Sequence, residues 1–140
     1  MIELIVVVAL IGIITAIGMP VFLSFWKAST LKAGAEELAA IVNSGRLLAI
    51  KENQNVCVSS NGTNVKYVVG GCAGTVWTGP GTDGSGLIRL ANSVTVSSTT
   101  TVVFNYLGAA TTAGTFTVRH PTDGKTLSVV VAATGRVTIQ

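Results

Sequence analysis

Glu3 is the residue whose placement most needs a chemical explanation. It is the only charged residue between Met1 and Trp26, and an apolar run from Leu4 to Phe25 follows it. Insertion scales assign a cost of about 2.5–3.5 kcal/mol to an acidic group at mid-membrane, so such groups usually have a partner. We therefore expect Glu3 to pair with a positively charged group in apolar surroundings. The alternative is a flanking residue at the level of the lipid head groups.

Catalytic groups are few in the rest of the sequence. His120 is the only histidine and precedes Pro121, so it is interpreted as a turn residue. Asp83 and Asp123 are each followed by glycine, which is typical of turns. No G-x-S-x-G stretch presents a nucleophilic serine, and two cysteines with one histidine lack the spacing of a zinc site. The sequence predicts a non-enzyme without a cofactor or metal.

Cys57 and Cys72 both follow the apolar segment, in turn-rich sequence. If this part of the chain lies outside the cytoplasm, a disulfide between them would close a loop of about 15 residues. Such a loop would contribute about 3 kcal/mol in the chain-entropy model. The alternative is a pair of unrelated buried thiols.

The apolar run from Leu4 to Phe25 could span about 33 Å as a helix, enough to cross the hydrocarbon core of a bilayer. Gly12, Gly18 and Pro20 interrupt it. Because Pro20 lacks a backbone donor and crowds the preceding turn, we expect a kink or local melting over residues 16–20.

After Trp26 the apolar pattern becomes one-sided, which indicates an amphipathic helix that lies on another element. No Gly or Pro separates the two parts, and Asn53 begins the first strong stop signal. We therefore expect one helix over residues 2–52. Its apolar stripe comprises Leu31, Ala35, Leu38, Val42, Gly45 and Ala49.

From residue 54 onward, short β-branched runs alternate with turn signals such as Asn61-Gly62 and Asp123-Gly124. These runs predict six to eight antiparallel strands. The fold class is α+β, with the helix covering one face of a small sheet or sandwich. We expect strands at 55–60, 65–69, 87–90, 94–98, 101–106, 115–119, 126–131 and 136–139.

The chain divides into three parts by this pattern: an apolar helix over 1–26, its amphipathic continuation over 27–53, and a globular β domain over 54–140. The net charge is +3, with single basic residues scattered along the chain and no basic block of the kind that announces nucleic-acid binding.

The opening, MIELIVVVALIGI, resembles the N-terminal helix of type IV pilins and type II secretion pseudopilins. Pro20 stands where that family places its helix-bending proline. The family's Phe-Thr pair, the preceding Gly and the basic leader do not occur in this sequence. Cleavage by prepilin peptidase would therefore require a leader upstream.

The remainder is similar to the GspH/FimT branch of that family. The similarity lies in the helix end from Arg46 to Asn53, the two cysteines, Trp77 and the run from Leu87 to Leu90. It continues through Val103-Phe104, Gly108, residues 115–118, residues 127–129 and Gly135-Arg136-Val137. Tyr106 replaces a family proline.

This resemblance implies a subunit that assembles with like or related subunits through its N-terminal helix. Glu3 would pair with the N-terminal amine of a neighbour, and Gly12 and Gly18 would permit close approach of helices or local unwinding. Simple tolerance of glycine in a membrane helix is the alternative for both glycines. Before assembly the helix would cross the bacterial inner membrane, with the β domain in the periplasm and an assembly platform as partner. After assembly the subunit would lie in a periplasmic pseudopilus or an extracellular pilus.

Some FimT-like pilins bind DNA through basic groups near the C-terminus, so a DNA-binding minor pilin is an alternative function. Arg119, Lys125 and Arg136 could lie on one edge here. Three phosphate contacts would bind weakly and with strong salt dependence, and solvated surface charge is the favoured interpretation. An alternative of another class is a membrane-anchored periplasmic domain that binds a ligand and never enters a fibre.

Overall fold

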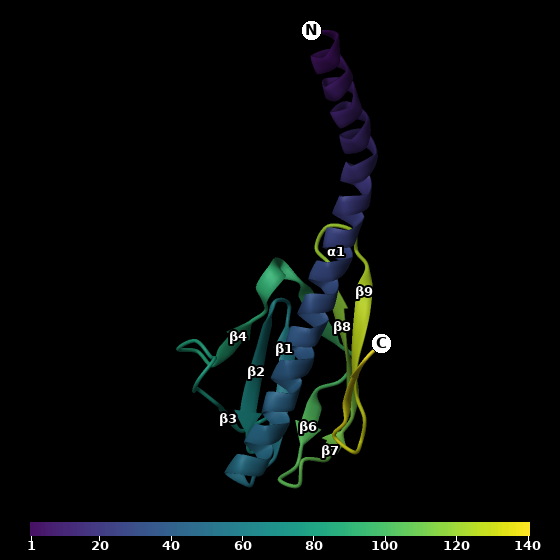
Figure 1. Cartoon of the computed structure of the whole chain (residues 1–140). Helices are drawn as coiled ribbons and strands as arrows, with labels where there is room; N and C mark the ends of the chain where they lie inside the picture. The colour runs from purple at the N-terminus through teal and green to yellow at the C-terminus, as the bar shows by residue number, and fades with distance from the viewer.

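The computed structural model describes residues 1–140, with the side chain of Asn92 excepted. A single helix, α1 (Ile2–Glu52), runs out of a β domain as a long rod (Figure 1). It ends at Asn53, which adopts a left-handed conformation with φ 51°. The N–H groups of Asn53 and Gln54 donate to the carbonyls of Ile50 and Ala49, at 3.4 and 3.2 Å. The expected extent of the helix and its stop at Asn53 are confirmed.

The local melting expected over residues 16–20 does not occur, because the helix is continuous through Pro20. Figure 1 shows instead that the rod curves gently where it extends beyond the domain. Proline removes one intrahelical hydrogen bond, and the intact turns on either side can hold the helix together. Pro20 therefore interrupts the hydrogen-bond ladder without ending the helix.

The second half of α1 lies on the β domain, as the one-sided pattern predicts. All six residues of the expected stripe are buried, and Gly34 and Leu48 are buried with them. Gly34 and Gly45 allow the helix to approach closely: a Cβ on Gly34 would lie 2.9 Å from Val94 Cγ2, and one on Gly45 would lie 2.7 Å from Val58 Cγ2. The helix contacts strands of both sheets described below.

Two antiparallel sheets form the domain. The first has the order β3-β2-β1-β6-β7, with β4 also paired to β2. Its strands are β1 (Val56–Asn61), β2 (Asn64–Val69), β3 (Thr75–Val76), β4 (Leu87–Arg89), β6 (Val102–Phe104) and β7 (Ala110–Thr112). The second has the order β10-β9-β8-β5. Its strands are β5 (Thr95–Ser98), β8 (Gly114–Arg119), β9 (Thr126–Val131) and β10 (Val137–Ile139), and a short 3-10 helix, η1 (Ala91–Ser93), precedes β5.

The eight expected strands are present, and β3 and β7 are additional. Both are two or three residues long, too short to give an alternating pattern in the sequence. The β1–β2 turn also differs by one residue from the expectation. Asn61 pairs with Asn64, so the turn residues are Gly62 and Thr63 rather than Asn61 and Gly62. Gly62 supplies the positive φ of 64° that this tight turn requires.

The core fills the space between α1 and the two sheets. Phe104 of the first sheet, Phe116 of the second and Leu38 of the helix are each fully buried. Valines from both sheets surround them: Val56, Val58, Val65, Val102, Val118, Val129 and Val131. Burial of this apolar surface holds the second half of α1 to the domain.

Candidate assembly surface

The rod that extends from the domain is uncovered along its whole length. Every residue from Met1 to Trp26 is exposed, including large side chains such as Ile5, Ile14 and Phe25 at 67%, 69% and 71%. Its mean hydropathy over the most apolar 18-residue stretch is 2.7, and none of that stretch is buried. By length and composition, this is a helix that could cross a membrane. An apolar surface of this extent marks a site of contact with lipid or with other protein.

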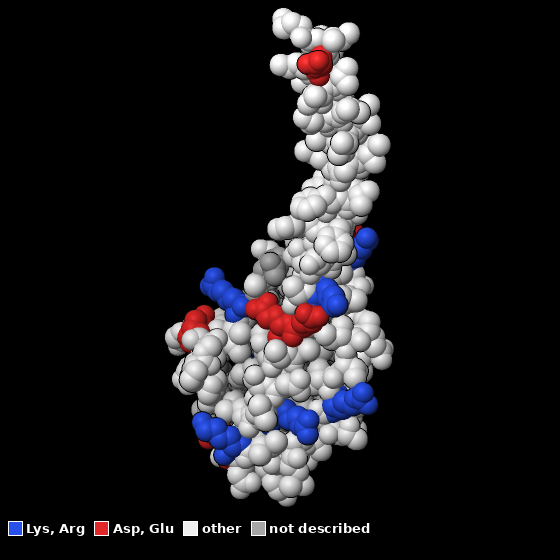
Figure 2. Space-filling view, in the orientation of Figure 1, with Lys and Arg blue, Asp and Glu red and all other residues white. Residues whose placement is uncertain are grey.

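Glu3 lies in the first turn of α1 and is exposed. Figure 2 shows one acidic side chain near the tip of the rod, surrounded by uncharged residues. A carboxylate in the first helical turn interacts favourably with the positive end of the helix dipole. That interaction offsets only part of the cost of moving the carboxylate into an apolar bundle.

Gly12 and Gly18 leave open space on the rod, since nothing lies within 4 Å of a Cβ built on either residue. Around Gly18 the surface is hollowed into a groove of about 490 Å³, lined by Ile14, Thr15, Met19, Phe22 and Leu23. The flanking side chains are large and Gly18 has none, so a neighbouring helix could approach closely at this point.

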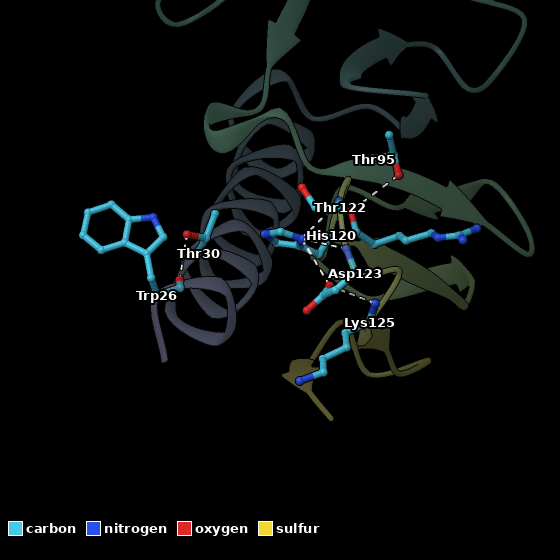
Figure 3. Close-up of polar contacts among 8 residues, drawn as sticks. Trp26, Thr30, Thr95, His120, Thr122, Asp123 and Lys125 are labelled. Carbon is cyan, nitrogen blue, oxygen red and sulfur yellow. Dashed lines mark hydrogen bonds and ion pairs between the residues drawn. The ribbon is translucent and has the colours of Figure 1, made fainter. Parts of the chain in front are cut away.

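The rod joins the domain at Lys27 to Leu31, where burial of the helix begins. The turn between β8 and β9, residues 120–125, lies beside the helix at this junction (Figures 1 and 3). His120 is 6% exposed, and its Nδ1 lies 3.1 Å from Asp123 Oδ1 and 3.2 Å from the Thr122 backbone nitrogen. The sequence-based interpretation of His120 as a turn residue is confirmed, and its ring helps to hold the turn together.

The three basic residues considered for DNA binding do not form a single patch, because Arg136 is separated from the other two. Arg119 ends β8 and pairs with Thr126 at the start of β9, so it lies with Lys125 at the junction end of the domain. Arg136 follows the turn at the other end of β9. It lies near Arg46 instead, because Arg46 Nε would lie 3.3 Å from a Cβ on the adjacent Gly135.

Arg46, Gly108 and Gly135, which lie in three of the segments similar to the GspH/FimT branch, pack against one another in the fold. The loops that follow β6 and β9 meet at the end of α1, where the Ala110 N–H donates to the Ala133 carbonyl at 3.0 Å. A Cβ on Gly135 would lie only 2.0 Å from the Gly108 carbonyl oxygen, and one on Gly108 would lie 2.9 Å from Arg46 Nε. The two glycines therefore allow both loops and the arginine to pack at a single point.

Cys57 and Cys72 form a disulfide, which confirms the bridge and excludes two separate thiols. Cys57 is buried on β1, and Cys72 is exposed at the start of the Gly-rich loop. The bridge fastens that loop near a groove of about 500 Å³ between α1 and the first sheet, lined by Ile41, Leu48, Tyr67, Trp77 and Ile88 among others.

Two ionisable groups beside this loop have pKa values displaced from the ordinary range. Burial raises the pKa of Tyr67 to about 12, a shift that a side-chain hydrogen bond with Ser44 partly opposes. Backbone N–H groups of Leu87 and Ser85 donate to Asp83 and lower the pKa of its carboxyl. Asp83 therefore has the turn role expected for it, and it organises the loop before β4. Nothing in the sequence marked Tyr67 as more than a strand residue.

Comparison with known proteins identifies the family and the fold of this chain. The model of the family GspH, type II transport protein GspH, matches residues 34–135. The crystal structure of the type IV minor pilin FimU of Pseudomonas aeruginosa is similar to this chain with a TM-score of 0.57 and 17% identity, covering 83% of this chain and 92% of that one. The minor pseudopilin EpsH of the Vibrio cholerae type 2 secretion system is similar with a TM-score of 0.59 and 10% identity, covering 79% and 95%. A search of curated protein sequences found no match. At these identities the two structures establish the shared pilin fold.

Proposed function

This chain belongs to the GspH family, and from that membership we propose that it is a structural subunit of a type IV pilus or of a type II secretion pseudopilus. The observation that carries the proposal is the uncovered apolar rod from Met1 to Trp26. A surface of this kind is stable against lipid or against other rods of the same kind, and a filament subunit needs both environments in turn.

In the proposed cycle, the rod first crosses the inner membrane with the β domain on the periplasmic side. An assembly platform in that membrane then moves the subunit into the base of a filament. If a leader precedes this sequence, prepilin peptidase removes it before assembly. The role of the chain is structural, as in the rest of the family.

Glu3 is proposed to guide entry into the filament by pairing with the N-terminal amine of a neighbouring subunit. The pairing removes an unpaired charge from an apolar bundle, and an unpaired buried charge costs several kcal/mol. Gly12, Gly18 and Pro20 are proposed to shape the rod for packing against its neighbours.

Glu3→Ala tests this role. The variant should still fold and enter membranes, since Glu3 contacts nothing in the domain. Its amount in sheared fibres should fall about tenfold or more, because the loss of an ion pair worth even 1.4 kcal/mol corresponds to a factor of ten. The measurement is immunodetection of the subunit in sheared fibres and in membranes. Glu52→Ala, an exposed acidic residue at the far end of α1, is the matched control and should assemble normally.

Normal incorporation of Glu3→Ala would refute the pairing. Absence of the unmodified chain from every fibre preparation would instead favour the membrane-anchored ligand-binding alternative, which predicts no dependence on Glu3. The DNA-uptake alternative stays a prediction, and the separation of Arg136 from Arg119 and Lys125 provides no single surface for it.

A further inference from the structure

The junction between rod and domain combines features that suit a lipid surface, an inference that rests on the proposed crossing of the membrane by the rod. Trp26 is 63% exposed and its ring lies 6.0 Å from that of Phe22. Lys27 follows at once. An aromatic residue followed by a basic residue at the end of an apolar span is typical of the boundary between hydrocarbon and head groups.

The β8–β9 turn brings residues from much later in the chain to this boundary. The turn lies beside α1, as Figure 1 and the close-up of Figure 3 show. This is the part of the helix where burial begins, at Lys27, Thr30 and Leu31. Thr30 lies four residues beyond Trp26, a rise of about 6 Å along the helix. The head-group layer on each side of a bilayer is about 5–8 Å thick. The turn is therefore level with the head groups when Trp26 lies at the edge of the hydrocarbon.

The charge at this end is positive. Lys125 is exposed on the turn, and the guanidinium of Arg119 lies over the same turn, with Nη2 3.2 Å from the position of a Cβ on Gly124. With Lys27 these make three cationic groups. The carboxylates at this end are that of Asp123, 3.1 Å from His120 Nδ1, and that of Glu37 further along α1, which accepts the Ala91 N–H at 3.0 Å. Figure 2 shows basic side chains at this end of the domain, with acidic side chains beside them. Further along α1, Lys32 pairs with Glu36 at 3.8 Å, so these two charges largely cancel.

We propose that Lys27, Arg119 and Lys125 form a basic collar that binds the anionic head groups of phospholipids. The collar holds the β domain against the membrane surface before assembly, and it limits the tilt of the domain about the rod. Release from the lipid would accompany entry of the rod into a filament. Anionic lipid is favoured over nucleic acid because these residues lie at the end of the domain from which the rod leaves, next to the point at which the helix would enter the bilayer.

Acetylation rates of single lysines test the collar. The full chain is placed in nanodiscs of phosphatidylcholine alone, or of phosphatidylcholine with phosphatidylglycerol, and labelling is followed by mass spectrometry. Acetylation of Lys125 and Lys27 should be slower by a factor of about three or more in the anionic discs. The difference between the two kinds of disc should vanish at about 1 M salt, where the Debye length is about 3 Å. Lys51, in the last turn of α1 at the far end of the domain, should react equally in both discs.

Two variants make the test specific. Arg119→Gln should reduce the protection of Lys125 in anionic discs, and Lys51→Gln should leave it unchanged. Equal labelling of Lys125 in neutral and anionic discs, in a chain that has entered both, would overturn the collar while leaving the filament proposal intact. A chain that does not enter discs at all would overturn the crossing of the membrane and the collar with it. Equal protection of Lys125 by duplex DNA in detergent would overturn the assignment to lipid.

Discussion

Tyr67 shows how a single side chain joins the helix to the sheet. It is 3% exposed, and its hydroxyl donates to the Ile41 carbonyl of α1 at 2.6 Å. Its ring lies 6.0 Å from that of Trp77, which follows β3. One residue of β2 therefore contacts both the helix and the loop that the disulfide fastens. An ionised Tyr67 would be poorly solvated here, which is why its pKa is raised to about 12.

Stability should consequently depend on pH through Tyr67. The raised pKa means that the folded state favours the neutral phenol. The contribution of Tyr67 to the free energy of unfolding is therefore complete below the ordinary pKa of 10.0 and is lost as the pH rises from 10 to 12. Tyr67→Phe should lower the free energy of unfolding by about 0.5–1.5 kcal/mol at neutral pH through the lost hydrogen bond. The same substitution should also reduce the fall in the free energy of unfolding between pH 10 and 12. Urea unfolding of the full chain in detergent across that range measures both effects.

The matched control is Tyr106→Phe, because Tyr106 is 51% exposed. It should leave both the stability and its pH profile close to those of the unmodified chain. If Tyr67→Phe loses stability above pH 10 as steeply as the unmodified chain does, ionisation of Tyr67 is not the cause of that loss.

At the scale of elements, contact between α1 and the first sheet depends on glycine at the point of closest approach. Gly45 faces Val58 of β1 and Tyr67 of β2, both of which are buried among other core residues. A side chain at this position would separate the helix from the sheet or displace a packed residue. The amphipathic period predicts which face of the helix is buried, but the size limit at Gly45 arises from the opposing sheet.

Gly45→Ala should therefore destabilise the domain despite the higher helix propensity of alanine. The propensity gain is about 1 kcal/mol, and overpacking of a rigid core typically costs about 1–3 kcal/mol. We expect a net loss of about 1 kcal/mol in urea unfolding of the full chain in detergent. Gly84→Ala, in open space and without a positive φ, is the control and should have little effect. An unchanged or increased stability of Gly45→Ala would show that the sheet yields at this point.

At the scale of the whole molecule, the rod and the domain are stabilised in different ways. The domain has its own core and a disulfide. The rod has no tertiary contact along Met1 to Trp26, and in the proposed cycle it depends on lipid or on other subunits. Changes in the rod should therefore affect assembly with little effect on the domain, whereas changes in the core should affect the stability of the domain.

Reduction of the Cys57–Cys72 bridge tests the stability of the domain alone. The bridge joins residues 15 apart, and in the chain-entropy model a loop of this size contributes about 3 kcal/mol. We expect the free energy of unfolding to fall by about that amount in reductant, while insertion of the rod into membranes continues. Cys57→Val combined with Cys72→Ala should match the reduced chain and should not respond to reductant. A reduced chain as stable as the oxidised one would contradict the expectation.

The sequence alone was sufficient for the helix and most of the strands, because these depend on local periodicity. The stripe from Leu31 to Ala49 has the helical period, and the stop at Asn53 and the turn glycines carry their own signals. The carboxylate at Glu3 is likewise evident from the contrast with its apolar surroundings. Very short strands and the register of the β1–β2 turn escaped prediction, since two or three residues carry no period and a one-residue shift leaves the pattern almost unchanged.

Only the tertiary structure decided which distant residues meet. It separates Arg136 from Arg119 and Lys125 by the length of β9, and it carries the β8–β9 turn to the place where α1 leaves the domain. It also shows that Gly108, Gly135 and Arg46 share one packing point, and that Tyr67 reaches the helix backbone. These contacts depend on strand order and on how the helix lies across two sheets, and neither leaves a periodic trace in the chain.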